Sequence, residues 1–458
     1  MKTWRFAAEA ALCLLAAVLP FNGVLGLKRM LLATAAVAAV GALYGRRTHW
    51  SWRTARELFA PCAPLLIFSG YCFLSMLWSE APVRTLRELY TDIFVPLVAV
   101  LVVLVVVDRP TALHRLTLAV VCGFTAAAVV ALAGVAYVGL QDRDLFLFPV
   151  LHGEGQLSTY AVFMLAPILW LALHGFEQQR RADRLLACVA LLCQLSVGLL
   201  TLSRIFWVAN LTVLAVMLCG LAMCPAFQGR LSVRRLLPGL AVLLLVHIGL
   251  YWWVGLQKPV NYLYSAAAQP QSIPPPLDTV VNLGKVPPPL LQSPSAVQPK
   301  DNGLPAPLET LFKNERYEIW SFWWRKIAQK PWLGYGFGMT VPPDAARPEM
   351  PAYWPALFGA HAHNRLLDIL AQLGVVGLVL WILVQAQLAL HGWQALRRGA
   401  PLAAAGAIAV LGLIVAYWTK NLTDDFMSRN PLFFYWVLTA LYGMSRAARH
   451  HAGEPSRT

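Results

Sequence analysis

Apolar runs of about 18 or more residues recur from one end of this 458-residue chain to the other. Each run is long enough to cross, as a helix, a hydrocarbon core roughly 30 Å thick. Only 13% of the residues are charged, against about 25% in an average soluble chain. The sequence therefore predicts an all-α polytopic membrane protein and excludes a soluble globular domain.

We expect about twelve transmembrane helices. The longest apolar stretch, residues 185–223, is interrupted only by Gln194 and by Ser203-Arg204. As one helix it would be about 58 Å long, too long for a single crossing, so it predicts a tight hairpin with Ser203 and Arg204 at or near its turn. The predicted spans are residues 6–20, 24–44, 61–78, 92–107, 112–138, 156–174, 185–202, 205–223, 236–255, 366–390, 401–418 and 431–446.

The distribution of basic residues orients these spans. With both termini in the cytoplasm, the inside segments carry a net charge of +13 and the outside segments +2, out of +15 for the chain. This is the positive-inside pattern of membrane proteins, so no nucleic-acid partner is needed to explain the basic composition. Lys28 and Arg29 begin the second span on the outer side, against the rule. Because no cleavage site follows Lys2 and Arg5, the first run is expected to be a span and not a signal peptide.

No set of side chains has the spacing of a metal or cofactor site. The eight cysteines all lie in or at the ends of apolar runs and are expected to be buried as small hydrophobic residues. The one carboxylate pair that argues for a metal, Asp424-Asp425, lies between Lys420 and Arg429 and is expected to pair with them. We therefore predict neither a metal nor a cofactor.

One long hydrophilic segment divides the chain into three parts. Residues 1–255 would carry nine spans, residues 256–360 an outer loop, and residues 361–458 three spans and a short cytoplasmic tail. The loop holds 18 of the 31 prolines, and its first half, to about residue 307, has no helical periodicity, which predicts an extended loop.

The second half of this loop predicts an amphipathic helix. Its apolar positions between residues 308 and 327 recur every three or four residues and fall within one arc of about 100°. Arg316 lies on that stripe, so its side chain is expected to point toward the membrane-facing interior; an arginine that snorkels to water is the alternative. The stripe positions are Leu308, Phe312, Arg316, Ile319, Trp323 and Ile327.

Two other outer segments are expected to be loops. Gly334-Tyr-Gly-Phe-Gly338 resembles a phosphate-binding loop only superficially, since no strand precedes it and no Gly-Lys-Ser/Thr follows, so it predicts a flexible turn. A charged segment before the fourth predicted span is expected to form local ion pairs at i, i+3 and i, i+4. Its charged residues are Glu80, Arg84, Arg87, Glu88 and Asp92.

Polar side chains collect at the outer mouth of span 366–390, where His361, His363 and Arg365 precede the apolar run. Arginine is costly at low dielectric unless it meets an anion, and its forked donors suit phosphate. A positive field keeps a nearby imidazole neutral, so that it can accept a proton. If Arg204 and Arg316 converge here, the site would hold a phosphate-bearing lipid and deprotonate a hydroxyl. The alternative is an interfacial cap with solvated histidines.

The spacing after the second histidine resembles the pattern of the O-antigen ligase and polymerase superfamily of bacterial envelope glycosyltransferases. His363-Asn364 is followed by nine residues, Gly374, two residues and Gly377, which fits the ligase pattern at every position. His361 does not fit, because Ala362 follows it. The two glycines are also expected to let another helix approach closely below the site.

Two further features are similar to that family. Ser203-Arg204 opens a span, and the helix that contains Arg316 leads into the glycine-rich turn. The motif-bearing part covers roughly residues 200–380, and the rest of the chain agrees only in the number of spans and the place of the large loop.

The resemblance implies transfer of a glycan from undecaprenyl diphosphate to a sugar hydroxyl of lipid A-core, on the periplasmic face of the bacterial inner membrane, which completes lipopolysaccharide. By the same resemblance, His363 would be the general base, while Arg204 and Arg316 would bind the diphosphate and offset the charge of the leaving group. One direct displacement implies inversion without a metal. Further substrate contacts are expected from His361, Asn364, Arg365, Arg84 and Arg87.

Other functions compete with a ligase. An O-antigen polymerase would use the same donor with a second glycan chain as acceptor, and a protein O-oligosaccharyltransferase is a third enzyme of this kind. A transporter of lipid-linked glycans should show repeat symmetry and charged or broken helices at the bilayer midplane. The unusual charges of this chain lie at one face, which favours an enzyme, and we expect a monomer.

Overall fold

Every regular element that the computed structural model describes is helical, which confirms the all-α prediction. Nine helices in this part of the chain are long and apolar enough to cross a membrane. Of the other predicted spans, α1 has 17 residues, Pro431–Met444 is a shorter apolar helix, and 236–255 lies mostly outside the described residues. The structure describes residues 2–45, 51–138, 150–151, 154–201, 203–227, 245, 248–249, 315–350, 361–398, 400–422 and 430–445.

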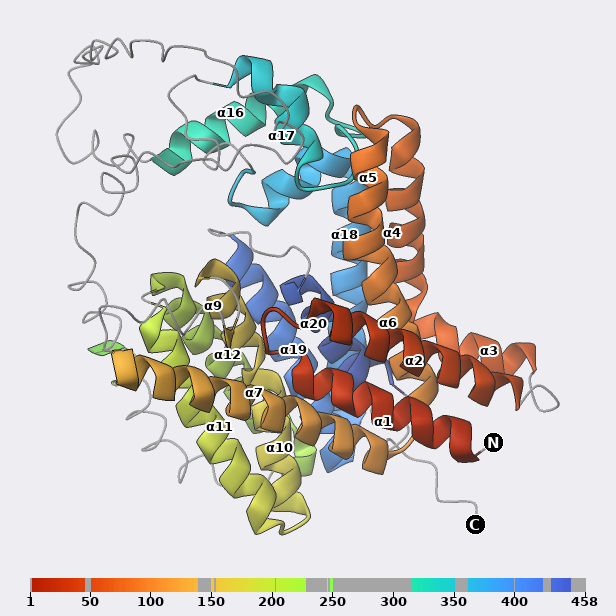
Figure 1. The fold of residues 1–458 in the computed structure, drawn as a ribbon, viewed down its shortest axis with the longest axis vertical. Coiled ribbons are helices and arrows are strands. Elements are labelled where there is room, and N and C mark those ends of the chain that lie inside the picture. The colour runs from red at the N-terminus through yellow and green to blue at the C-terminus, as the bar shows by residue number, and fades with distance from the viewer. Residues whose placement is uncertain are drawn as a thin grey trace, which may run out of the picture.

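Several consecutive helices of the described residues, such as α10 and α11 or α18 and α19, are joined by short connections (Figure 1). Two π-helical turns, Leu89–Phe94 and Ala440–Met444, continue α5 and α20. The α-helices are α1 (Lys2–Val18), α2 (Leu25–Tyr44), α3 (Trp52–Phe59), α4 (Ala63–Leu74), α5 (Pro82–Glu88), α6 (Val95–Val106), α7 (Pro110–Val138), α9 (Glu154–Phe163), α10 (Leu165–Glu177), α11 (Arg181–Leu200), α12 (Arg204–Met223), α16 (Glu315–Gln329), α17 (Val341–Ala346), α18 (Arg365–Arg398), α19 (Pro401–Asn421) and α20 (Asn430–Thr439).

Several helices that are neighbours in sequence pack together, among them α1 with α2, α10 with α11 and α18 with α19. The predicted break in the long apolar run is confirmed, since α11 ends at Leu200 and α12 begins at Arg204, after Ser203. The expected tight packing of these two helices on each other is wrong, because α11 packs on α10 and α7 while α12 packs on α19. Helix α19 packs between α12, α10 and α18 and is buried along most of its length. Its Tyr417 lies against two other buried aromatic rings, with centroids 5.4 Å from Trp381 and 4.9 Å from Tyr435. These rings form the core directly below the site described next.

The prediction of a loop over residues 80–92 is wrong from Pro82 onward. Helix α5 begins at Pro82 and continues through the π-helical turn into α6, so that Pro82–Val106 is one helical stretch. Proline is well suited to the first position of a helix, because its missing N–H would have no intrahelical partner there. The fourth span, predicted to begin at residue 92, therefore begins at Pro82, and its charged residues lie on the faces of a helix.

Helix α18 also departs from the expectation of an unbroken span. Gly374 has non-helical dihedral angles, φ 64° and ψ −167°, so residues 365–373 form a separate segment, and the second segment continues to Arg398. The first segment packs with α16 and α17 at one end of the bundle, and α4 packs beside α18 (Figure 1). We call this end of the molecule the site end.

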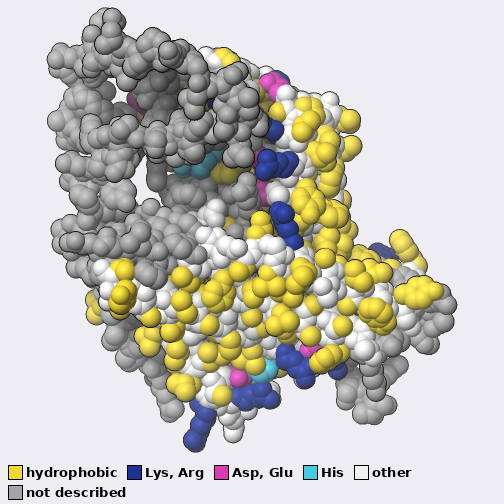
Figure 2. All heavy atoms as spheres, viewed as in Figure 1, with side chains coloured by type: hydrophobic (Ala, Val, Ile, Leu, Met, Phe, Trp, Pro, Cys, Tyr) yellow, Lys and Arg dark blue, Asp and Glu magenta, His cyan; other side chains and the backbone are white. Residues whose placement is uncertain are grey.

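The face formed by α1, α2 and α7 is covered mainly by apolar side chains, as expected of a surface that meets lipid (Figure 2). Lysine and arginine gather below this band and again above it, along the inner edge of the region of α5. The apolar band therefore separates two basic zones at opposite ends of the bundle.

Candidate active site

Residues 361–364 form a tight turn, the histidine turn, immediately before α18. His363 has a left-handed backbone, with φ 50°, which is uncommon for a residue other than glycine. Its backbone N–H donates to Nδ1 of His361 at 3.1 Å, and the indole N–H of Trp320 on α16 donates to the carbonyl of Ala362 at 2.9 Å. Strained backbone persists only where its surroundings fix it, and it gathers at functional sites.

The ring of His361 is hydrogen-bonded within the histidine turn, to the backbone of His363. The ring centroids of the two histidines are 4.0 Å apart. Nδ1 of His361 accepts from the backbone of His363, and its 3.6 Å separation from Oδ2 of Asp368 is longer than a hydrogen bond. The other carboxylate oxygen of Asp368 accepts the backbone N–H of Ala362 at 2.8 Å. His361 therefore holds the backbone that presents His363.

Asn364 is the N-cap of α18. Its side-chain oxygen accepts the backbone N–H groups of Leu366 at 3.0 Å and Leu367 at 3.3 Å, the arrangement by which asparagine commonly starts helices. Its side-chain nitrogen donates to the carbonyl of Leu422, at the end of α19, at 2.8 Å. Both ends of the amide are thus engaged within the protein, and a substrate contact from Asn364 stays a prediction.

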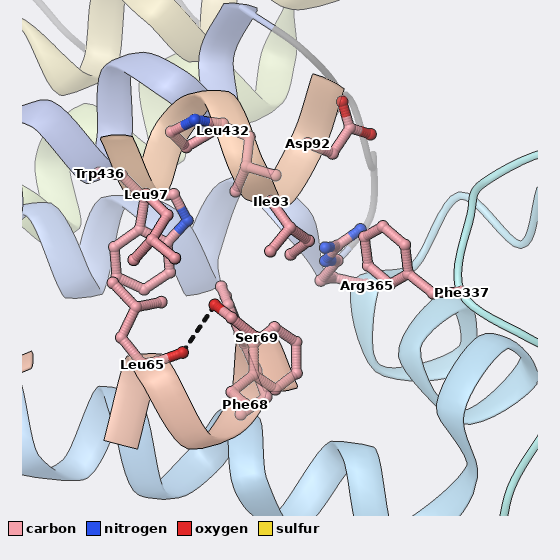
Figure 3. A pocket seen from close by; sticks show the side chains of 12 residues that line it. Leu65, Phe68, Ser69, Asp92, Ile93, Leu97, Phe337, Arg365, Leu432 and Trp436 are labelled. Carbon is pink, nitrogen blue, oxygen red and sulfur yellow. Dashed lines mark hydrogen bonds between the residues drawn. The ribbon is translucent and has the colours of Figure 1, made fainter. Parts of the chain in front are cut away.

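The side chain of Arg365 lies between those of Ile93 and Phe337, at one side of a small pocket (Figure 3). Only 6% of the residue is exposed, its Nε donates to the hydroxyl of Tyr417 at 3.1 Å, and its guanidinium carbon lies 5.9 Å from the Trp381 ring centroid. It lines a cavity of about 10 Å³ together with Asp92 and Phe337, a space that suits about one water molecule. Arg365 thus fixes the start of α18 to α19, and its predicted substrate contact remains untested.

The break at Gly374 is filled by the loop that follows α16, residues 330–340, and not by another helix. This corrects the prediction that Gly374 lets another helix approach closely. A Cβ atom there would lie 2.2 Å from the carbonyl carbon and oxygen of Trp332. Beyond the break, the backbone N–H of Val375 donates to the carbonyl of Pro331 at 2.8 Å. At Gly377 a Cβ would meet the side chain of Leu373 in the same helix, at 2.1 Å.

The other side of this loop is bonded to the first segment of α18. The backbone N–H of Tyr335 donates to the carbonyl of Ala371, and that of Gly336 to the carbonyl of Gln372, each at 2.9 Å. Burial raises the pKa of Tyr335, so its hydroxyl remains a donor and reaches Oε1 of Gln329 on α16 at 3.0 Å. The loop of residues 330–340 is therefore hydrogen-bonded both to α16 and to the first segment of α18.

The glycine-rich turn, residues 334–338, is a turn as expected, with a conformation fixed by bonds to distant segments. Its three glycines have φ values of 67°, 113° and 130°, which other residues rarely adopt. The backbone N–H groups of Met339 and Thr340, just after it, donate to the carboxylate of Glu88 on α5. Gly338 donates to Oε1 of Gln372 at 3.1 Å. The carboxylate of Glu88 thus accepts hydrogen bonds from backbone N–H groups that, in a phosphate-binding loop, would donate to the phosphate.

Helix α16 has the predicted amphipathic form. Its buried stripe belongs to one apolar cluster with Ala362 of the histidine turn and Ala371 of α18. The helix therefore packs directly on the turn that carries His363. The stripe residues within the described part are Ile319, Trp323 and Ile327.

The backbones of the two predicted phosphate-binding arginines lie where the sequence predicts. Arg204 is the first residue of α12, and Arg316 is the second residue of α16, one turn before the buried Ile319. Both side chains lie outside the described part of the structure, as do Asp424 and Asp425. Convergence of these arginines on His363 therefore stays a prediction.

Arg84 and Arg87 have different surroundings, although both belong to α5. Arg84 forms an ion pair with Asp344 of α17, a partner far away in sequence. Arg87 lines a groove together with Lys28 and Arg29 of α2. Arg84, Glu80 and Glu88 thus contact distant elements in place of the expected local partners, since Glu80 pairs with Lys330 and Glu88 accepts from the backbone after the glycine-rich turn.

The structure also shows a cluster that the sequence pattern does not reveal. His114, His174 and Asp183, from α7, α10 and α11, bring their ligand atoms within 4.8 Å of one another, which corrects the expectation that no His/Asp/Glu cluster resembles a metal site. Both imidazoles are hydrogen-bonded to the same Asp183 oxygen at 2.9 Å. At 1.5 Å per residue, Asp183 lies about 26 Å along α11 from Leu200, the end of this helix that precedes Arg204. Only the packing of three helices reveals this cluster.

Comparison with known proteins supports the resemblance. Residues 187–382 match the family model described as O-antigen ligase, a region that includes Arg204, Arg316 and His363. A segment of 71 residues is 39% identical to a protein of Rickettsia conorii and, equally, to one of Rickettsia felis; both bear the provisional name polysaccharide ligase. The aligned segment spans 15% of this chain and only 17% of either relative.

Proposed function

We propose that this chain transfers a glycan from undecaprenyl diphosphate to a sugar hydroxyl of lipid A-core, because residues 187–382 match the O-antigen ligase family model. The observation that carries the proposal is the histidine turn, which holds His363 in a strained conformation at the start of α18, within the family region. The turn would face the periplasm from the inner membrane, with both chain termini in the cytoplasm, residues 256–360 as a periplasmic loop, and the monomer as the working unit.

In this reaction His363 is the general base. It removes the proton of the acceptor hydroxyl, whose oxygen attacks the anomeric carbon of the donor glycan. The bond from that carbon to the diphosphate oxygen breaks, and undecaprenyl diphosphate leaves with the bonding electrons. One displacement inverts the anomeric configuration. A positioned base of this kind contributes about 10²- to 10⁴-fold to a rate.

The positive charge for this step comes from Arg204 and Arg316, which would bind the two phosphates and stabilise the leaving group. With arginines in that role the transfer needs no metal. His361 and Asn364 serve the base indirectly, since one accepts the backbone N–H of His363 and the other caps the helix behind it.

The test is a transfer assay with purified protein, lipid-linked glycan, and either lipid A-core or a second glycan chain as acceptor. Transfer of the glycan to lipid A-core supports the ligase, and elongation of the second glycan chain supports a polymerase. Movement of the lipid-linked glycan across a bilayer without a new glycosidic bond supports a transporter. His363→Ala should lower transfer by about 10²- to 10⁴-fold and leave donor binding intact. The matched control is His391→Ala, toward the other end of α18. An active His363→Ala protein would remove His363 from the base role.

A further inference from the structure

A groove of about 420 Å³ collects positive charge from two helices near the site end. Lys28 and Arg29 of α2 and Arg87 of α5 line it, and within the described part of the chain no carboxylate does. The remaining wall combines two polar side chains with an apolar surface. These lining residues include Asn22, Thr91, Leu25, Leu32, Val95 and Phe433.

Lys28 is the buried member of this set. Only 7% of the residue is exposed, and its ammonium donates to the carbonyls of Leu19 at 2.9 Å and Phe21 at 2.6 Å. No carboxylate of the described residues pairs with it within 4.0 Å. A lysine ammonium has three donors, so one is left for the groove that Lys28 lines. A buried charge without an opposite charge is costly, and a bound anion would remove that cost.

The groove lies one helix away from the candidate active site. Arg87, Thr91 and Val95 recur every four residues and line the groove, whereas Glu88 binds the backbone after the glycine-rich turn and Asp92 lines the Arg365 cavity. Similarly, Phe433 on α20 lines the groove while its neighbour Leu432 lines that cavity. The stretch from α5 to α6 therefore turns a cationic face to the groove and an acidic face to the site.

We infer that Lys28, Arg29 and Arg87 bind a phosphate group on the headgroup of the acceptor lipid, the phosphorylated glucosamine unit of lipid A. The inference rests on the proposed function. Three cations and no carboxylate among the described lining residues select a phosphate, and the apolar wall suits the beginning of an acyl chain. Since α2 is itself long and apolar enough to span a membrane, a lipid can reach the groove from the bilayer. The donor diphosphate would occupy Arg204 and Arg316, so the two lipids would not compete.

Binding is measured without any donor, by native mass spectrometry of the purified protein in detergent. The variant Arg29→Gln/Arg87→Gln removes two exposed charges, and Arg397→Gln removes an exposed arginine from the far end of α18 as control. At about 1 kcal/mol per cation near a membrane surface, the double variant should bind lipid A roughly 30-fold more weakly, while the control binds like the wild type. Equal affinity of wild type and double variant would overturn the inference.

The choice of ligand separates the sources of phosphate. Lipid A with its phosphates removed should bind the wild type as weakly as phosphorylated lipid A binds the double variant. If phosphatidylglycerol binds as tightly as lipid A and with the same dependence on Arg29 and Arg87, the groove takes any anionic lipid and the acceptor assignment is refuted. Tight binding of inorganic phosphate alone would refute a lipid site.

A transfer assay then connects the groove with the reaction. The double variant should raise the KM for lipid A-core roughly 30-fold and leave the KM for the donor and the kcat at saturating acceptor unchanged. A change in the donor KM instead would assign the groove to the donor. If the protein transfers no glycan at all, the proposed function fails while the lipid-binding measurement still tests the groove.

Discussion

Replacing Gly374 by alanine places a methyl group where the backbone of Trp332 already lies. A Cβ at this position would be 2.2 Å from the carbonyl carbon and oxygen of Trp332, and backbone atoms cannot move aside as a flexible side chain can. The dihedral angles, φ 64° and ψ −167°, belong to a region that is essentially restricted to glycine. Both effects act against the folded state.

The magnitude follows from these two effects. The backbone strain costs about 1–3 kcal/mol and the overpacking another 1–3 kcal/mol, so the free energy of unfolding should fall by roughly 2–6 kcal/mol. Gly70→Ala is the matched control, because Gly70 lies inside α4 and a methyl group added there would have no neighbouring atom within 4 Å. That change should leave stability unchanged or raise it by up to about 1 kcal/mol.

The measurement is the thermal unfolding midpoint of the purified protein in detergent, followed by tryptophan fluorescence, together with glycan transfer. Gly374→Ala should lower the midpoint by several degrees and reduce transfer, since the loop can no longer lie in the break of α18. A Gly374→Ala protein with the midpoint and the transfer rate of the Gly70→Ala control would refute the described packing at this position.

Three other perturbations test the site. Asn364→Ala should cost about 1 kcal/mol of unfolding free energy through loss of the cap, and Asn364→Ser, which can still cap, should retain most of it in the same unfolding assay. Arg204→Lys and Arg316→Lys should each lower kcat on the order of 10²-fold, because an ammonium does not replace a bidentate fork; wild-type kinetics would make both arginines structural. EDTA should leave transfer unchanged, and a loss restored by a divalent cation would bring Asp424-Asp425 or the His114 cluster into the mechanism.

Features with a local cause are predictable from this sequence. The stripe of α16 follows from helical periodicity, and Ile319, Trp323 and Ile327 are all buried. The break between α11 and α12 follows from the length of the apolar run, which exceeds one membrane crossing. The place of His363 just before α18 follows from the change of polarity at residue 365.

Features that depend on partners far away in the sequence are not predictable in this way. Spacing alone allows Glu88 to pair with its neighbours, yet its carboxylate accepts the backbone N–H groups of Met339 and Thr340. Gly374 lies in an apolar run that is typical of a continuous helix, and only the approach of Trp332 explains its break. Hydropathy reports burial and span length but not which segments meet, so it predicts a loop for a charged helix such as α5.

The break in α18 separates the position of the histidine turn from the thickness of the membrane. A bilayer of different thickness changes the tilt of a spanning helix, and in a continuous helix that tilt would carry the histidine turn with it. Here the first segment is bonded to the loop around Tyr335 and packed on α16, while the second segment follows after Gly374. The span can adapt to lipid composition while His363 keeps its place relative to the loop and α16.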